Sequence, residues 1–303
     1  MNLLTIDVED WHSLVQRRIT GVLPPISPFL SRQVDNILEI LSASNTKATF
    51  FLVGYVAAQR PDLVKELVAQ GHEIASHGYV HKVIYQLTPQ AFRDDTYRSK
   101  CLLEDITGQA VQGYRAAEFS VLKKTGWALE ILAELGFRYD SSIFPIYHRR
   151  YGIPDFPLTA QRCRLNNGAD IVEIPLSVAL VGKHRLPFSG GGYFRLLPLK
   201  VIVKQIESLQ RRSLPLVTYF HPYEFDDQRL NGFDYMPAKS ISGSLKCWRY
   251  NLLQNINRKS TIKKLTYLIK NLRFTTCQEF LSKSNIPSSD YFIVNRKYYE
   301  KII

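Results

Sequence analysis

The sequence has no long apolar run and only four cysteines in 303 residues. A transmembrane helix needs about 20 consecutive apolar residues, so none is predicted. No two cysteines form a CxxC pair, which argues against a zinc knuckle or a redox motif, and we expect free thiols. Internal repeats and low-complexity linkers are also absent. With 45% hydrophobic and 22% charged residues, the chain has the composition of an ordinary globular protein rather than a disordered one.

The opening segment MNLLTIDVEDWH lacks the basic region and the long apolar region of a secretory signal. It carries acids instead, at Asp7, Glu9 and Asp10. We therefore expect a cytoplasmic protein, with peripheral association with the inner membrane as the alternative.

The positive charge is concentrated near the C-terminus. The chain carries a net charge of +12, and from Lys246 onward there are 12 Lys and Arg against 3 acids. Such a stretch suits an anionic membrane surface or an anionic lipid-linked saccharide, and a solvated basic helix face is the alternative. No nucleic-acid motif accompanies it, so nucleic acid is not an expected partner. The oligomeric state stays open.

Short apolar runs alternate with amphipathic stretches along the chain. Strands are predicted at 3–6, 48–54, 73–77, 112–116, 137–142, 171–176 and 216–222, and helices at 29–41, from 61, from 88, at 123–135 and at 197–212. Strands that alternate with helices indicate an α/β fold built from parallel units. In a parallel barrel, reactive side chains lie at the C-terminal ends of strands, where this chain has Asp7, His77, Arg115, Asp140 and His221.

A metal site is predicted from two of these strand ends. His77 and His81 are four residues apart, and three carboxylates crowd the segment DVED (7–10). Two imidazoles and one carboxylate form a three-ligand site for a divalent ion, and the ion would relieve the repulsion between the acids. We expect zinc, although other first-row ions accept the same ligands. The alternative is a solvated acidic turn with one buried and one exposed histidine.

Two further strand ends suit acid–base chemistry. His221 follows an apolar strand and can act as a general acid, because histidine titrates near neutrality. Arg115 can orient a carboxylate base and keep it ionised. The alternatives are a core histidine bonded to a backbone carbonyl and a plain salt bridge.

These residues and the segments around them resemble the polysaccharide deacetylases with a NodB homology domain, which form carbohydrate esterase family 4. More narrowly, they resemble the branch of this family that is associated with exopolysaccharide biosynthesis. The matching segments are TIDVEDWH (5–12), ATFFLVG (48–54), HEIASHGYVHKVIYQLTPQAFRDD (72–95), GYRAAEFS (113–120), YDSSIFPIYHRRYGIPDFP (139–157), GGGYFRLLP (190–198) and YFHPYEFD (219–226). The stretch 249–276 resembles the C-terminal extension of that branch more loosely.

The resemblance implies a distorted (β/α) barrel of about seven parallel strands with a C-terminal helical extension. It implies metal-dependent removal of acetyl groups, usually N-acetyl, from an amino-sugar polysaccharide or its lipid-linked precursor. By position, it makes Asp7 the catalytic base, His77 and His81 metal ligands, Arg115 the residue that orients the base, and His221 the acid that protonates the leaving amine. Asp10 is the expected metal-binding acid, with Glu9 as second choice, and Asp140 is expected to orient His221.

The sequence departs from the family pattern at Ala117–Glu118, where the branch usually has a proline after the arginine motif. Loss of the proline loosens a turn of the site, and Glu118 adds a negative charge near the base or the metal. A catalytically weak or inactive carbohydrate-binding protein on the same barrel is therefore the alternative function.

Aromatic residues near these motifs suggest sugar subsites, with Trp11, Tyr114 and Tyr193 as candidates. We expect one catalytic domain over 1–284, which includes a basic extension at 246–284, followed by a tail at 285–303.

Overall fold

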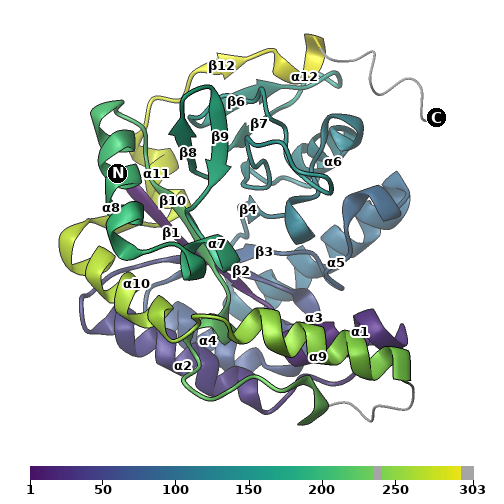
Figure 1. Ribbon diagram of the computed structural model, residues 1–303. Helices are drawn as coiled ribbons and strands as arrows, with labels where there is room; N and C mark the ends of the chain where they lie inside the picture. The colour runs from purple at the N-terminus through teal and green to yellow at the C-terminus, as the bar shows by residue number, and fades with distance from the viewer. Residues whose placement is uncertain (235–240, 295–303) are drawn as a thin grey trace.

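The fold is built on one large, mostly parallel sheet. The computed structural model describes residues 1–234 and 241–294. In this part of the chain the strand order is β10-β1-β2-β3-β4-β5-β7-β6-β12, and β11 also pairs with β1 (Figure 1). All strands from β10 to β7 in this order are parallel to their neighbours, and β6 is antiparallel to β7. The prediction of an α/β fold with about seven parallel strands is confirmed.

The strands of this sheet are short except for the first. Their bounds are β1 Asn2–Val8, β2 Thr49–Leu52, β3 Glu73–Ser76, β4 Gly113–Tyr114, β5 Tyr139–Asp140, β6 Gln161–Arg164, β7 Asp170–Glu173, β10 Val217–Phe220, β11 Phe274–Thr275 and β12 Ser288–Ser289. A separate hairpin consists of β8 Val178–Val181 and β9 His184–Pro187.

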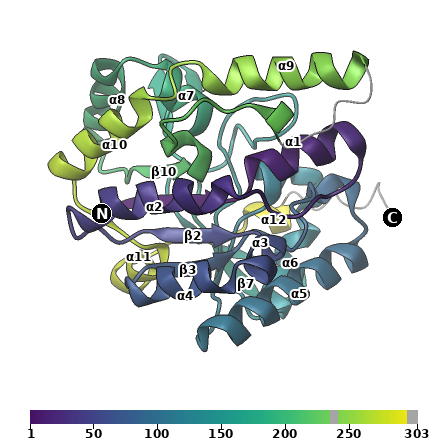
Figure 2. The same cartoon turned by 90° about the horizontal axis from the view of Figure 1, so that it is seen from below.

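Helices cover the outside of the sheet. Figure 1 shows α2 and α4 below strands β1 to β3, and the view from below in Figure 2 shows the same two helices in front of these strands. The helix bounds are α1 Trp11–Thr20, α2 Phe29–Ser42, α3 Gly54–Gln59, α4 Pro61–Ala69, α5 Pro89–Thr107, α6 Trp127–Glu134, α7 Gly191–Leu196, α8 Leu199–Arg211, α9 Ile241–Asn255, α10 Ser260–Asn271, α11 Cys277–Lys283 and α12 Tyr291–Val294. Within residues 1–234 and 241–294, none of the helices has both the length and the apolar character that crossing a membrane requires.

The strands are apolar because the sheet is covered on both faces. Leu3, Leu4 and Ile6 of β1 are all fully buried, although neighbouring residues point to opposite faces. A strand in a covered parallel sheet has this continuous apolar pattern. The result is a sheet whose C-terminal edge can carry polar groups on a rigid base.

Several elements were not predicted from the sequence. Helix α1 follows β1 directly, and the glycine-rich segment 189–198 contains the short helix α7. The close approach of this segment to β10 requires a glycine, because a Cβ at Gly190 would lie 2.0 Å from the Tyr219 carbonyl oxygen. The first part of the predicted tail adds β12 to the sheet beside β6, and residues 295–303 lie outside the described residues.

Candidate metal and catalytic site

Polar side chains from three strand ends line one cavity of about 310 Å³. β1 contributes Asp7 and Glu9, the segment after β3 contributes His77 and His81, and His221 follows β10. These strands end at the same edge of the sheet because they are parallel. The structure thus brings together residues that lie more than 200 positions apart in the sequence.

Three of these side chains could hold a metal ion. Among the described residues, Glu9, His77 and His81 each offer a ligand atom, and these atoms all lie within 4.8 Å of one another. The Nδ1 of His77 lies 2.7 Å from the Arg115 carbonyl oxygen, which leaves the Nε2 lone pair for an ion. The Nε2 of His81 lies 2.8 Å from Glu9 Oε2. Two imidazoles and one carboxylate fit a divalent first-row ion and leave coordination positions open.

The protonation states also suit metal binding. Burial lowers the pKa of His77 to about 4, so this imidazole is neutral at physiological pH. Burial alone would raise the pKa of Glu9, but the positive charges of His81 and His221 hold it well below its ordinary value. A neutral imidazole and an ionised carboxylate are the forms that bind a metal.

The loop that carries the histidines is held from two sides. Asp95 on α5 accepts hydrogen bonds from the backbone N–H groups of Tyr79 at 2.7 Å and Val80 at 3.1 Å. Arg17 on α1 donates to the carbonyl oxygen of His81 at 2.7 Å and to that of Val80. His81 itself has a left-handed backbone with φ of 51°, which non-glycine residues adopt only when the surroundings impose it.

Asp10 is not part of this cluster, and the acid that lies with the two histidines is Glu9, the second choice of the sequence analysis. Asp10 is the N-cap of α1, and its carboxylate accepts hydrogen bonds from the backbone N–H of Ser13 at 3.1 Å and from Ser27 N at 2.9 Å and Oγ at 2.6 Å. The Ser13 hydroxyl also donates to it. With both oxygens engaged, Asp10 fixes the start of the helix rather than a ligand position.

Asp7 and Arg115 form a buried ion pair beside the triad. One guanidinium nitrogen of Arg115 donates to Asp7 Oδ1 at 2.7 Å and to Thr5 Oγ1 at 2.7 Å. The other two donate to the carbonyl and the hydroxyl of Ser141, both at 2.8 Å. Asp7 lines the cavity while Arg115 lies behind it, which is the arrangement predicted for a base and its orienting residue.

His221 has a carboxylate partner that the sequence analysis missed. Its Nδ1 lies 2.7 Å from Glu224 Oε1, and its Nε2 lies 3.7 Å from Glu9 Oε1. Burial alone lowers the pKa of His221, but the hydrogen bond that its imidazole donates to Glu224 and the charges of Glu9, Glu224 and Asp7 raise it to about 9. The imidazolium is therefore the prevailing form at neutral pH. The spacing His221-x-x-Glu224 on either side of Pro222 was the available signal.

Asp140 does not reach His221, contrary to the prediction. Its carboxylate accepts a hydrogen bond from Ser142 at 2.5 Å and interacts with the buried Glu173. Burial raises the pKa of Asp140 to about 6, although the hydrogen bonds from Glu173 and Ser142 oppose this. Burial and the charge of Asp140 raise the pKa of Glu173 further, so Glu173 stays protonated.

The three predicted subsite aromatics have different positions. Tyr193 lines the cavity. Tyr114 is buried in the core between Phe92 and Phe137, with ring centroids at 5.7 Å from each. Trp11 is buried against Tyr223 in a small apolar cluster. The structure therefore leaves Tyr193 as the candidate that lines the cavity and makes the other two packing residues.

Glu118 lies at the cavity wall between two arginines. Its carboxylate oxygens lie 2.7 Å from the Arg18 guanidinium and 3.2 Å from that of Arg150. All three side chains line the cavity. The extra negative charge expected from the departure at 117–118 is therefore balanced by arginines rather than directed at the base.

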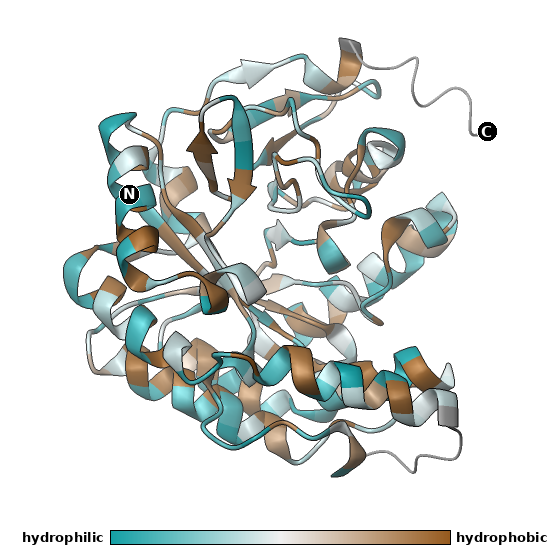
Figure 3. Ribbon diagram, in the orientation of Figure 1, coloured by the Kyte–Doolittle hydropathy of each residue, from teal (hydrophilic) through white to brown (hydrophobic). Residues whose placement is uncertain are grey.

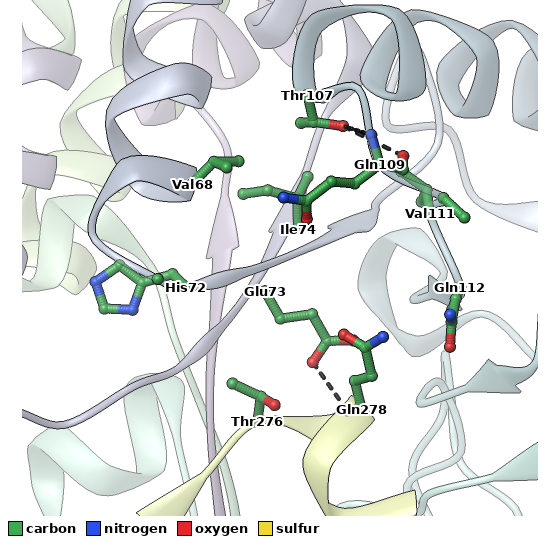
Figure 4. A pocket seen from close by; sticks show the side chains of 12 residues that line it. Val68, His72, Glu73, Ile74, Thr107, Gln109, Val111, Gln112, Thr276 and Gln278 are labelled. Atoms are coloured by element: carbon green, nitrogen blue, oxygen red, sulfur yellow. Dashed lines mark hydrogen bonds between the residues drawn. The ribbon is translucent and has the colours of Figure 1, made fainter. Parts of the chain in front are cut away.

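A second cavity, of about 500 Å³, lies at the opposite end of the strands (Figure 4). Its acid, Glu73, accepts hydrogen bonds from Thr49 at 2.6 Å, Tyr139 at 2.7 Å and the Gln278 backbone N–H at 3.0 Å. Its histidine, His72, accepts from the Ala48 backbone N–H at 3.3 Å. These contacts join α11 to the sheet, and no metal cluster is found there among residues 1–234 and 241–294.

Comparison with known proteins divides the chain into two regions. Residues 25–139 match the family described as polysaccharide deacetylase, and residues 141–282 match a domain of unknown function, DUF3473. The first region contains His77, His81 and Arg115, and the second contains His221 and Glu224.

Relatives of established name share parts of the chain. A peptidoglycan deacetylase of Helicobacter pylori is 31% identical over 47% of this chain and 52% of its own length. A chitooligosaccharide deacetylase of Sinorhizobium fredii is 44% identical over 26% of this chain and 31% of its own length. The chain thus spans about half or less of these relatives.

A solved structure supports the fold over a larger part of the chain. It comes from Mycobacterium smegmatis and is named as a candidate polysaccharide deacetylase. It aligns with 90% of this chain and 92% of its own, at a TM-score of 0.54 and 22% identity. This likeness shows the distorted barrel fold.

Proposed function

We propose that the chain is a member of the polysaccharide deacetylase family and a metal-dependent hydrolase that removes N-acetyl groups from an amino-sugar glycan. The match of residues 25–139 to that family, followed by a DUF3473 match over residues 141–282, supports this proposal. The glycan is a polysaccharide or its lipid-linked precursor, and the setting is exopolysaccharide synthesis in the cytoplasm. The names of the two relatives, a peptidoglycan deacetylase and a chitooligosaccharide deacetylase, support deacetylation of a glycan.

One arrangement carries this proposal. The Asp7–Arg115 pair lies beside the three potential ligands Glu9, His77 and His81. His221 faces the same cavity with its Nε2 3.7 Å from Glu9. A carboxylate base, a metal site and a protonated histidine in one cavity are the groups that amide hydrolysis requires.

Each residue then has a defined role. A divalent ion held by Glu9, His77 and His81, which we propose to be zinc, would supply Lewis-acid activation of water and of the acetyl carbonyl. Asp7 takes the proton of the attacking water, and Arg115 holds its carboxylate in place. His221 gives a proton to the leaving nitrogen, so that acetate and a free amine are the products.

The proposal is tested by metal content and acetate release together. Protein purified without chelator should contain about one ion per chain, and acetate should be released from N-acetylated oligosaccharides in a metal-dependent manner. Metal without acetate release on these oligosaccharides or on lipid-linked acceptors would support the carbohydrate-binding alternative. Neither metal nor release under any ion would overturn the proposal.

Glu9→Gln and Asp10→Asn should separate the ligand from the helix cap. Glu9→Gln should weaken metal binding by more than the roughly 10- to 100-fold that follows loss of a ligand's hydrogen-bond partner. Asp10→Asn should keep the metal and lower the free energy of unfolding by about 1 kcal/mol, because one oxygen that accepts from Ser13 or Ser27 becomes an NH₂ group that cannot accept. Metal titration and urea unfolding measure both effects. Loss of metal in Asp10→Asn alone would return the ligand role to Asp10.

Glu224→Gln should shift the alkaline limb of the pH profile of kcat/KM to lower pH by at least about one unit. The reason is that Glu224 helps to raise the pKa of His221 to about 9, and only protonated His221 can donate. The raised pKa of His221 also makes the stability of the fold depend on pH. The raised pKa stabilises the fold fully below about 6.5, and this contribution is lost as the pH rises through 9.

Asp140→Asn is the matched control for this variant. It alters the acid that the sequence pointed to, which lies with Ser142 and Glu173 instead of His221. Its alkaline limb should stay where it is in the unaltered protein. A shift in Asp140→Asn, with none in Glu224→Gln, would contradict the assignment.

A further inference from the structure

Hydrogen bonds of two asparagines, together with the buried Cys247 and the partly buried Tyr250, attach helix α9 to the protein. Asn251 Oδ1 accepts a hydrogen bond from the Gly232 backbone N–H at 2.8 Å. The side chain of Asn255 bonds both backbone groups of Leu230, at 2.9 Å and 2.8 Å. Figures 1 and 2 both show α9 along α1 at the edge of the molecule. The inward face of this helix is thus held by amide side chains as well as by packing.

The outward side of α9 carries a row of exposed apolar side chains, which is unusual for a surface helix. Leu245, Trp248 and Leu252 are 67%, 57% and 48% exposed, and Ile256 just beyond the helix is also exposed. Their spacing of three or four residues places them on one stripe. Figure 3 shows the brown bands along α9 at the lower edge of the molecule. An exposed apolar stripe of this kind indicates an interaction surface.

The segment that carries the stripe has charges of a single sign. Residues 241–276 contain eight Lys and Arg and no Asp or Glu. Arg258 and Lys264 are buried and bond backbone carbonyls. The other six are exposed: Lys246, Arg249, Lys259, Lys263, Lys270 and Arg273. On α9 itself, Arg249 and Lys246 lie beside the apolar stripe by helical spacing.

We propose that α9 is an interfacial helix that docks this protein on an anionic lipid surface. Apolar side chains that enter the headgroup region, flanked by basic residues that meet anionic lipids, form the pattern of such a helix. A second copy of the chain fits this face less well, because a symmetric contact would bring the same positive charges together. The basic residues then attract the anionic lipid surface over about a Debye length, and the apolar stripe adds short-range contact with the lipids.

The docking surface borders the catalytic cavity. Gln254 of α9 lines that cavity together with Arg18 of α1, and its side chain accepts a hydrogen bond from Arg195 of α7 at 2.8 Å. Docking by α9 would therefore bring the mouth of the cavity close to the lipid surface. The binding itself does not depend on the hydrolytic activity.

Flotation with lipid vesicles tests the proposal on the full chain. The protein should float with vesicles of phosphatidylcholine that contain about one third phosphatidylglycerol, and binding should fall with salt. It should float much less with phosphatidylcholine alone. Trp248→Ser combined with Leu252→Ser should weaken binding at least about tenfold. Arg249→Glu should weaken it about fivefold or more.

A matched control removes apolar area elsewhere. Val181 and Leu186 on the β8–β9 hairpin are about as exposed as Leu252, and their change to serine should leave vesicle binding unaltered. Unchanged binding by the Trp248/Leu252 variant, or no binding to anionic vesicles at low salt, would overturn the proposal. So would a dimer in sedimentation velocity that the same variant abolishes, because the face would then belong to a second copy.

Discussion

Asp7→Asn is expected to lower kcat by about 10²- to 10⁴-fold and to leave the metal content unchanged. The amide that replaces the carboxylate cannot take the proton of the attacking water. The potential metal ligands are Glu9, His77 and His81, and Asp7 is not among them. Acetate release and metal analysis on the same preparation measure both quantities.

A folding control belongs with this variant, because Asp7 is also the partner of Arg115. Circular dichroism and the midpoint of thermal unfolding should show an intact barrel. His77→Ala is the complementary variant and should lose metal and activity together. If Asp7→Asn loses its metal while it stays folded, Asp7 is a ligand and the division of roles at the end of β1 is wrong.

The sequence predicted most of the site because parallel strands place their C-terminal ends at one edge. Asp7, His77 and His221 each follow a short and largely apolar run that could be recognised without a structure, and Arg115 follows the short strand β4. The covered sheet makes such runs apolar on both faces, so a charged or imidazole side chain after the run marks the strand end. A strand end can be recognised in this way however far it lies in the sequence from the other strand ends. His221 could therefore be predicted as a site residue although it is far from Asp7 in the sequence.

The error at Asp10 has a simple geometric cause. Side chains alternate along a strand, so Asp7 and Glu9 point to the same side while Val8 enters the core. Asp10 already belongs to the start of α1, a helix that the sequence analysis did not predict. The combination Asp10-x-x-Ser13 before a helix is an N-cap pattern and could have assigned the residue correctly.

Other site partners could not be predicted because they depend on packing. Glu224 reaches His221 through the turn after Pro222, whereas Asp140 is engaged by Ser142 and Glu173 from a neighbouring strand. Only Asp140 was named from the sequence. A strand end gives the position of a residue, but the partner that it meets depends on how the next loop folds back.

Arg115→Met is expected to lower the free energy of unfolding by about 3–5 kcal/mol and to abolish activity. Arg115 is fully buried, and its guanidinium donates to Asp7, Thr5 and Ser141 and lies 4.1 Å from the ring of Phe51. Methionine fills part of the space but leaves the Asp7 carboxylate buried without its cation.

The double variant Asp7→Asn/Arg115→Met separates this charge effect from lost packing. It removes the unpaired carboxylate together with the arginine, so it should be more stable than Arg115→Met alone. Urea unfolding measures the free energies of unfolding of the unaltered protein, of Arg115→Met and of the double variant. All three proteins are kept metal-free, so metal binding does not contribute. A loss below about 1 kcal/mol in Arg115→Met, or no recovery in the double variant, would show that the pair does not hold the base in place, since a buried charge left without its partner must cost more.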